Sequence, residues 1–173
     1  AARIYLPDYI IRITGDCPLF DGALLDEAIA TMAESSDYLG MLSETFADGL
    51  DIEIIKYTAL QRAWKEARLQ SQREHVTQYI IHNPDIFHLQ DFVSPIGDFG
   101  SNRWTLDEPE DYQLIRTIIE HFTQENIYDY GYEDILQYLA ANPELKELNA
   151  KYSRNEGLAT SLKNDCYIDI TEE

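Results

Sequence analysis

The sequence has few basic residues, and it contains no long apolar segment. Lysine and arginine number 13 against 32 aspartates and glutamates, which gives a formal net charge of −19 and a pI near 4.3. Such a surface repels a phosphate backbone, so nucleic acid is not expected as a partner. An anionic substrate must instead meet a local cationic group or a bound metal ion. No apolar run approaches the roughly 18 residues that indicate a membrane span, so membrane insertion is not expected.

Several motifs of common enzyme classes are also absent. There is no Walker-type or dinucleotide-type glycine-rich loop, and no Gly-x-Ser-x-Gly nucleophile elbow. The four histidines form no zinc-type spacing with one another or with either cysteine. The two cysteines, Cys17 and Cys166, lie far apart in the chain. We expect both to stay reduced thiols in a cytoplasmic protein.

The hydrophobic pattern indicates one α/β domain or part of one. A chain of 173 residues is long enough to bury a substantial core. Short β-branched and apolar runs predict strands at 9–14, 38–42, 51–55, 87–93 and 103–106. Helices are predicted between and after them, beginning at Asp21, Thr58, Arg73, Asp107 and Pro143. We expect residues 1–122 to form the sheet and its covering helices, and residues 123–173 to form peripheral helices and an acidic, poorly ordered tail.

The most informative stretch surrounds Asp16. The apolar run 9–14 stops at Gly15, and Pro18 cannot return directly to a sheet because it has no N–H group. Asp16 is therefore predicted just past the carboxyl end of a central strand, where open α/β sheets bind ligands and where a carboxylate can hold Mg²⁺. Asp16 could equally organise the turn by hydrogen bonds to its own downstream backbone. The local sequence leaves both interpretations open.

Asp107 is predicted to end a second strand. It is also a suitable N-cap for the next helix, with Glu110 at the capping-box position, and a capping aspartate needs no other role. If both strands are parallel, Asp16 and Asp107 emerge at the same edge of the sheet and could share one divalent ion. That ion would offset the repulsion between an acidic protein and a nucleoside triphosphate.

Two further groups of polar residues are candidates for substrate binding. Asp51 and Glu53 alternate with apolar residues and so share one face of a strand. That face is either a solvated sheet edge or the wall of a cleft that binds sugar hydroxyls or an amine. Arg73, Glu74 and His75 gather at a predicted helix start. They could bind an acidic sugar, or they could form a surface ion pair of little energetic weight.

Four short motifs follow one another along the chain, and their order is informative. They are Arg-Ile-Thr-Gly-Asp-Cys-Pro-Leu at 12–19, Asp-Gly-Leu-Asp-Ile-Glu at 48–53, Arg-Glu-His-Val-Thr at 73–77 and Arg-Trp-Thr-Leu-Asp-Glu-Pro-Glu-Asp at 103–111. Together they resemble the cytidylyltransferases of the spore coat polysaccharide biosynthesis type. These are relatives of the CMP-sialic acid and CMP-Kdo synthetases, within the nucleotide-diphospho-sugar transferase superfamily. The Ser-Leu-Lys-Asn-Asp at 161–165 is similar as well.

The resemblance implies a fold, an activity and a set of site residues. The fold is a Rossmann-like α/β/α sandwich with a mixed, mostly parallel sheet. The activity is transfer of CMP from CTP to a sugar, usually an acidic one, with release of pyrophosphate, and a homodimer is expected. Mg²⁺ is the implied cofactor, with Asp16 and Asp107 as its ligands and as the catalytic pair. Gly15 and Asp16 match nucleotide-binding positions, and the implied substrate-binding residues are Arg12, Asp51, Glu53, Arg73, Glu74 and His75.

The chain departs from this family in one respect. Family members begin with a Gly-rich loop that carries Arg and Lys and holds the triphosphate and base, and the sequence contains no such loop. We therefore expect the fold to be incomplete at its N-terminal half, with an exposed sheet edge. Three functions stay open: a Mg²⁺-dependent nucleotidyltransferase, a non-catalytic truncated or degenerate module that binds a partner or a sugar nucleotide, and a metal-dependent phosphohydrolase.

Overall fold

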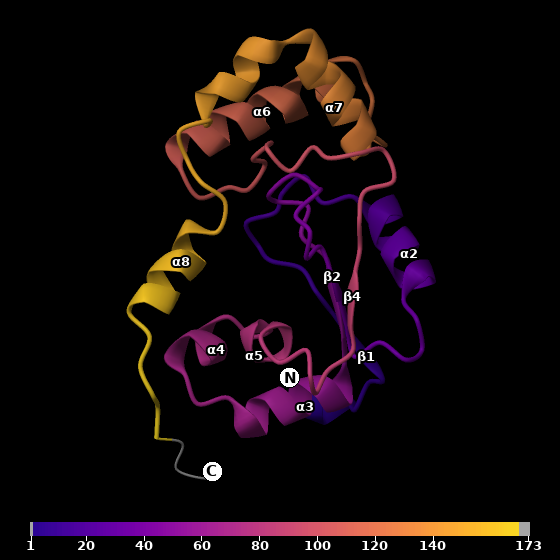
Figure 1. The fold of residues 1–173 in the computed structure, drawn as a ribbon. Helices are drawn as coiled ribbons and strands as arrows, with labels where there is room; N and C mark the ends of the chain where they lie inside the picture. Colours follow the sequence, from indigo (N-terminus) through magenta and orange to yellow (C-terminus); the bar gives the residue numbers. More distant parts are fainter. Residues whose placement is uncertain (1, 170–173) are drawn as a thin grey trace.

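The computed structural model describes residues 2–169 and has a four-stranded mixed sheet at its centre (Figure 1). The strands lie in the order β1-β3-β2-β4, and β3 runs antiparallel to both of its neighbours while β2 and β4 are parallel. Three strands therefore point the same way and one points back. The strands are β1 Tyr9–Arg12, β2 Tyr38–Gly40, β3 Glu53–Lys56 and β4 Leu89–Asp91. The predicted α/β class is confirmed, although each strand is shorter than expected.

Helices surround this sheet and extend beyond one end of it (Figure 1). Their bounds are α1 Ala2–Tyr5, α2 Gly22–Thr31, α3 Tyr57–Glu66, α4 Gln70–Glu74, α5 Gln78–Ile81, α6 Pro109–Gln124, α7 Tyr132–Ala141, the 3₁₀ helix η1 Pro143–Leu148 and α8 Glu156–Lys163. Among residues 2–169, no helix combines the length and apolar character that crossing a membrane would require.

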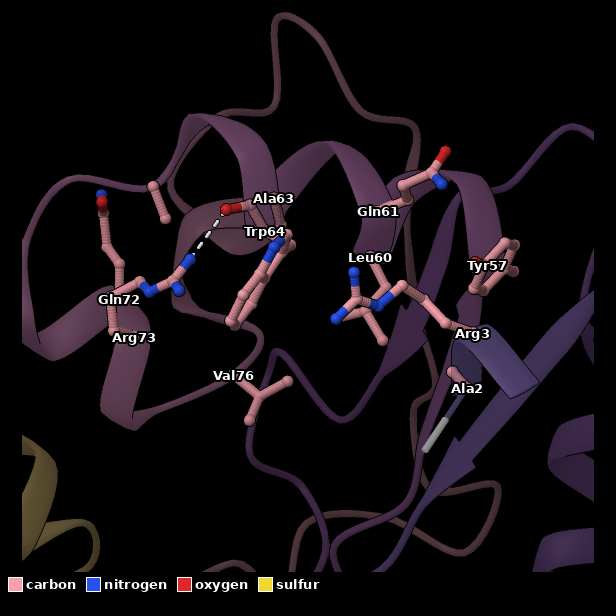
Figure 2. A pocket seen from close by; sticks show the side chains of 11 residues that line it. Ala2, Arg3, Tyr57, Leu60, Gln61, Ala63, Trp64, Gln72, Arg73 and Val76 are labelled. Carbon is pink, nitrogen blue, oxygen red and sulfur yellow. Dashed lines mark hydrogen bonds between the residues drawn. The ribbon is translucent and has the colours of Figure 1, made fainter. Parts of the chain in front are cut away.

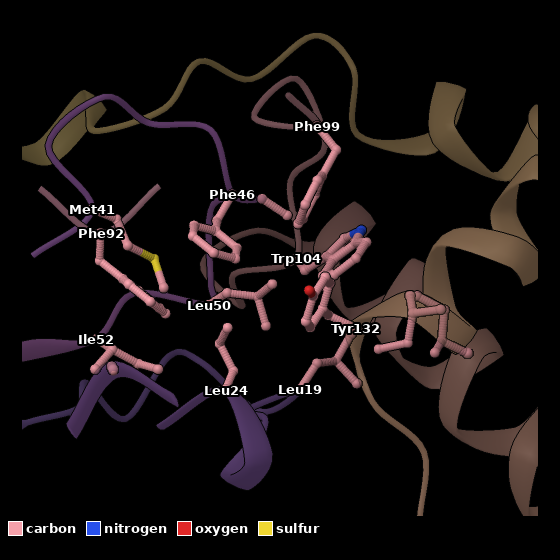
Figure 3. Close-up of a cluster of buried hydrophobic side chains, with 14 of the residues drawn as sticks. Leu19, Leu24, Met41, Phe46, Leu50, Ile52, Phe92, Phe99, Trp104 and Tyr132 are labelled. Carbon is pink, nitrogen blue, oxygen red and sulfur yellow. The ribbon is translucent and has the colours of Figure 1, made fainter. Parts of the chain in front are cut away.

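The two faces of the sheet bury different cores. Ile54 joins the main core with α2, α6 and α7, whereas its neighbour Ile55 joins a smaller core with α3 and α5. This is the layered arrangement that period-2 alternation along β3 requires. The main core is rich in aromatic rings, with Phe46, Trp104 and Tyr132 packed around Phe99 (Figure 3). Helix α7, in the region expected to be peripheral, contributes two fully buried side chains to this core, Ile135 and Leu139.

Asp21 caps α2 as the sequence predicts. One of its carboxylate oxygens accepts hydrogen bonds from the backbone N–H groups of Ala23 (2.9 Å) and Leu24 (3.1 Å). The other oxygen accepts one from the backbone N–H of Tyr132 (2.9 Å). The same side chain therefore satisfies the start of α2 and anchors the start of α7.

The strand predicted at 103–106 was wrong. Only one parallel bridge forms, between Asp48 and Arg103, with Trp104 N–H donating to the Asp48 carbonyl at 2.6 Å. The ladder stops because Gly49 turns the chain away at once, with φ of +101°. A Cβ at Gly49 would lie 2.5 Å from the backbone of Trp104 and Thr105, so the close approach depends on glycine.

Three predicted helix starts are also corrected. Helix α6 is capped at Glu108 rather than Asp107, because Asp111 lies three residues beyond Glu108 and accepts its backbone N–H at 3.0 Å. Helix α3 begins at Tyr57, so Thr58 lies inside it. Residues 70–72, predicted to be a break, form α4, and the stretch 73–77 spans the end of α4 and its connection to α5.

The C-terminal segment is held against α4 as far as it is described. Asp165 accepts hydrogen bonds from the backbone N–H (3.0 Å) and hydroxyl (2.6 Å) of Ser71. Tyr167 forms an antiparallel bridge with Leu69. Residues 165–169, predicted to belong to a poorly ordered tail, thus have defined contacts with α4 and the residue before it, and residues 170–173 lie outside the described part.

Candidate functional site

A cleft of about 930 Å³ brings together most of the residues predicted from sequence. It lies between the end of β1, the start of β3, the α4–α5 connection, the segment before α6 and the start of α8. The predicted site residues that line it are Arg12, Asp16, Asp51, Glu53, Glu74, His75 and Asp107. Gly15 lies in the exposed turn beside Asp16 and is not among the lining residues, and Arg73 lies elsewhere.

Asp16 and Asp107 reach this cleft from two segments that run side by side. The carbonyl of Asp16 accepts a hydrogen bond from the backbone N–H of Leu106 (2.8 Å) and another from the hydroxyl of Thr105 (3.2 Å). Arg103, Thr105 and Asp107 line the cleft while Trp104 is buried in the core, so alternation still operates in this segment without a strand. The segments that carry the two aspartates are thus neighbours, although only Asp16 follows a strand. That strand, β1, was predicted to be central but lies at the edge of the described sheet.

The donor set suits a cation that is shared with a substrate. Within residues 2–169, no group of three or more histidine, cysteine, aspartate or glutamate side chains is placed to hold a metal ion alone. Mg²⁺ is commonly held by one or two carboxylates together with substrate phosphates and water. Asp16 and Asp107 fit that arrangement, because both line the cleft and the Asp107 side chain is 52% exposed.

At the end of β1, Arg12 and Glu53 form a cross-strand pair. They stand opposite each other in the β1–β3 register, and the Arg12 guanidinium donates a hydrogen bond to the Glu53 carboxylate. The buried hydroxyl of Tyr38 donates to the other carboxylate oxygen at 2.7 Å. Burial and the adjacent Glu53 charge raise the pKa of Tyr38 well above its ordinary value, so its hydroxyl keeps its proton.

Arg103 lies at the centre of a buried ionic network. Its guanidinium donates to both oxygens of Asp111 (3.0 and 2.9 Å), to Asp48 (3.1 Å) and to Asp107 (3.1 Å). Asp111 is fully buried and also accepts from the side chain of Asn149 at 2.8 Å. Burial would raise the pKa of Asp111, but the hydrogen bonds from Arg103, Asn149 and the backbone outweigh it and hold that pKa below its usual range.

Asp48 is a carboxylate in this network whose ionised form is disfavoured by its surroundings. Burial raises the pKa of Asp48 from 3.8 to about 6, even though Arg154 and Arg103 oppose the rise. The nearby Asp51 and Asp107 charges add to the rise. Asp48 was seen in the sequence only as part of a turn, because its burial depends on contacts with distant segments.

Arg154 enters the same cleft from the far end of the chain. Its guanidinium donates to Asp51 at 2.7 Å and to the carbonyl of Phe46 at 2.8 Å. Sequence reasoning missed this residue, and it also gave Arg103 no role of its own. The sequence did offer one signal for both arginines: basic residues are scarce, and each arginine is one of only 13 in a strongly acidic chain.

The predicted group of Arg73, Glu74 and His75 is divided between two surfaces. Glu74 and His75 line the cleft, and Glu74 accepts a hydrogen bond from the hydroxyl of Ser161 at 3.2 Å. Arg73 instead lines a separate groove of about 360 Å³. There its guanidinium stacks over the ring of Trp64, 3.7 Å from the ring centroid, and donates to the Trp64 carbonyl (Figure 2). Arg73 is therefore not part of the cleft.

Comparison with known proteins identifies relatives of this chain. The cytidylyltransferase family profile matches residues 1–154. An uncharacterised protein of Methanocaldococcus jannaschii is 33% identical over 153 residues, which cover 87% of this chain and 60% of that protein. The spore coat polysaccharide biosynthesis protein SpsF of Bacillus subtilis is 31% identical over 147 residues, covering 80% of this chain and 57% of that protein.

A solved structure shows that the likeness extends to the fold. A cytidylyltransferase from Leptospira borgpetersenii superposes with a TM-score of 0.77 and 30% sequence identity, over 84% of this chain and 61% of that one. The chain thus spans about 60% of the length of the relatives it matches. It belongs to the cytidylyltransferase family.

Proposed function

We propose that this chain carries the metal-binding and sugar-binding part of a cytidylyltransferase that transfers CMP from CTP to a sugar and releases pyrophosphate. The observation that carries the proposal is the pair of neighbouring aspartates, Asp16 and Asp107, in a cleft otherwise lined by hydrogen-bonding side chains. Mg²⁺, when bound by this pair, would neutralise charge on the α-phosphate and on the leaving pyrophosphate.

The chain's own residues would bind and orient the sugar. The Arg12–Glu53–Tyr38 group fixes one wall of the cleft, because each side chain is held by another. Arg12 is 36% exposed and could receive the carboxylate of an acidic sugar, which the family resemblance favours. Asp51, Glu74 and His75 supply further groups for sugar hydroxyls. Positioning of this kind accounts for much of the rate acceleration when the reacting groups are aligned in line.

A non-catalytic function is the alternative that a specific observation favours. The sequence contains no Gly-rich loop with Arg and Lys to hold a triphosphate. A chain with this cleft could then bind a sugar or a sugar nucleotide without turnover. The homodimer and the cytoplasmic location stay predictions.

Pyrophosphate release from CTP tests the proposal. It should require both Mg²⁺ and an added sugar, and it should be measured over a panel of acidic and neutral sugars. Asp16→Asn and Asp107→Asn should each lower kcat by about a hundredfold or more, because each removes a charged group aimed at the reacting phosphates. Asp129→Asn, at an exposed position away from the cleft, serves as the matched control.

The outcomes separate the three functions. Release that depends on the sugar identifies a transferase, and release without any sugar identifies a hydrolase. Binding without release supports the non-catalytic alternative. Full activity in both aspartate variants would reject the shared-metal arrangement.

A further inference from the structure

The cleft contains many carboxylates and few cations. Nine aspartates and glutamates line it, against three arginines and one histidine. The arginines are Arg12, Arg103 and Arg154. An anionic ligand in such a cleft must bind either a metal ion or an arginine that still has N–H groups to donate. The three arginines differ in that respect: Arg12 donates one hydrogen bond, to Glu53, whereas Arg154 donates two and Arg103 donates five within the described residues.

Arg103 has no donor left. A guanidinium carries five N–H groups, and those of Arg103 make five hydrogen bonds: four to carboxylate oxygens of Asp48, Asp107 and Asp111, and one to the carbonyl of Ser153. Its side chain is only 11% exposed. Arg103 therefore holds the walls of the cleft together and cannot receive a ligand without losing an existing partner.

Arg154 uses two of its five donors within the described part of the chain. One goes to the carbonyl of Phe46 and one to Asp51. Glu44 lies 3.7 Å from its Nε, which makes an ion pair but is too long for a hydrogen bond. The Arg154 side chain is 14% exposed, close to the 11% of Arg103, but its partner Asp51 is 40% exposed, so that ion pair can exchange for a ligand more readily than the Arg103 network can.

The element that follows Arg154 is also free to adjust. Helix α8 begins two residues later and buries no side chain. It is attached to the cleft by polar contacts, from Asn155 to Glu44 and from Ser161 to Glu74 (both 3.2 Å). Because α8 buries no side chain, a small shift of this segment could turn the Arg154 guanidinium toward a ligand without opening the core.

We propose that Arg154 is a substrate-binding residue that receives an oxyanion of the substrate, either a phosphate group of CTP or the carboxylate of an acidic sugar. The proposal rests on the proposed cytidylyltransferase function. A guanidinium suits both groups because its planar fork matches two oxygens and because it stays charged at any physiological pH. In the absence of a ligand, the ion pair with Asp51 orients the Arg154 guanidinium.

Binding measurements on charge-matched ligands test this assignment. Calorimetric titrations with Mg²⁺ present compare CTP with cytidine, and N-acetylneuraminate with its methyl ester. Arg154→Ala should raise the Kd of the charged member of one pair by about tenfold or more, since one charge-assisted contact is worth at least that much. The neutral member of that pair should be affected by less than about twofold. Arg154→Lys, which keeps the charge but not the fork, should recover part of the affinity.

Arg116→Ala provides the control, because Arg116 lies on α6 and pairs with Glu120 outside the cleft. A change confined to CTP identifies a phosphate as the bound group, and a change confined to N-acetylneuraminate identifies a carboxylate. A purely structural role of Arg154 would weaken charged and neutral ligands alike, and that result overturns the proposal. So does the absence of any charge-dependent loss. If the unmodified chain binds none of the four ligands, the proposed function itself fails, whatever Arg154 does.

Discussion

Arg103 and Arg154 line the same cleft and are almost equally buried, but they differ in how many of their N–H donors are used. Arg103 is fully hydrogen-bonded and packed between α6 and Asn149 at the end of η1. Arg154 precedes a helix with no buried side chain and keeps most of its donors available. We infer that the first region maintains the shape of the cleft and that the second region adapts to what enters it. Buried networks of this kind resist opening, and elements attached by exposed polar contacts open readily.

The largest effect is expected from breaking the buried network. Asp111→Ala would leave the Arg103 guanidinium buried without its bidentate partner and would remove the acceptor for two backbone N–H groups at the start of α6. The free energy of unfolding should fall by about 3–5 kcal/mol, the typical cost of removing one partner of a buried ion pair. Urea denaturation measures it. The exposed Asp129→Ala should change stability by less than about 0.5 kcal/mol. If Asp111→Ala lowered the free energy of unfolding as little as Asp129→Ala, the inference that the Arg103 network maintains the shape of the cleft would be wrong.

A smaller effect should appear in the dependence of stability on pH. The pKa of Asp48 is raised to about 6 in the folded state, so the folded protein favours the protonated form. Its contribution to stability is therefore present below the unfolded pKa and is lost as the pH rises through about 4 to 6. Asp48→Asn stays neutral, and its stability relative to wild type should increase by about 1–3 kcal/mol from about pH 4 to about pH 7.

The comparison is made by denaturing both proteins in urea at several pH values in that window. A stability difference that does not change with pH would show that Asp48 is ionised normally. Arg154 opposes the rise in the pKa of Asp48 more strongly than Arg103 does. When Arg154→Ala is present in both proteins, the pH range over which their stability difference changes should therefore move to higher pH.

The smallest effect is expected where the C-terminal segment meets α4. Asp165→Ala removes the two hydrogen bonds from Ser71 that hold this segment. Amide hydrogen exchange in 156–168 should become about two- to tenfold faster, as expected from losing contacts of this strength, while exchange in α6 stays unchanged. Asp169→Ala, an exposed position in the same segment, is the control. Equal acceleration in α6 would mean that the segment and the core open together.

Local features of the fold were predictable from sequence. The N-cap at Asp21 was found because an N-cap acts on backbone groups two or three residues away. The cap of α6 was missed by one residue, because two acidic residues compete there and Asp111 favours Glu108. The antiparallel direction of β3 was not predicted, although the alternation of acidic and apolar residues at 51–55 is typical of antiparallel strands.

Most of the predicted site residues line one cleft, but the boundaries of that cleft were not predictable. Asp16 and Asp107 were selected because carboxylates near a sheet edge suit a cation, and the structure places their segments together. Arg73 was grouped with His75 by adjacency in sequence and by the family resemblance, and the end of α4 turns the two toward different surfaces. Arg154 could not be connected to Asp51, because 103 residues separate them.

The sequence by itself determined the acidic balance, the scarcity of cations, the short alternating elements and the motifs that mark the cytidylyltransferase family. These properties depend on residue identity and on neighbours within a few positions. Only the tertiary structure decided which arginine has used all of its N–H donors and which still has donors for a ligand. That outcome depends on carboxylates that are brought together from distant segments when the core that contains Trp104 forms. Hydrogen-bond saturation is a property of the packed molecule, and no single stretch of the chain encodes it.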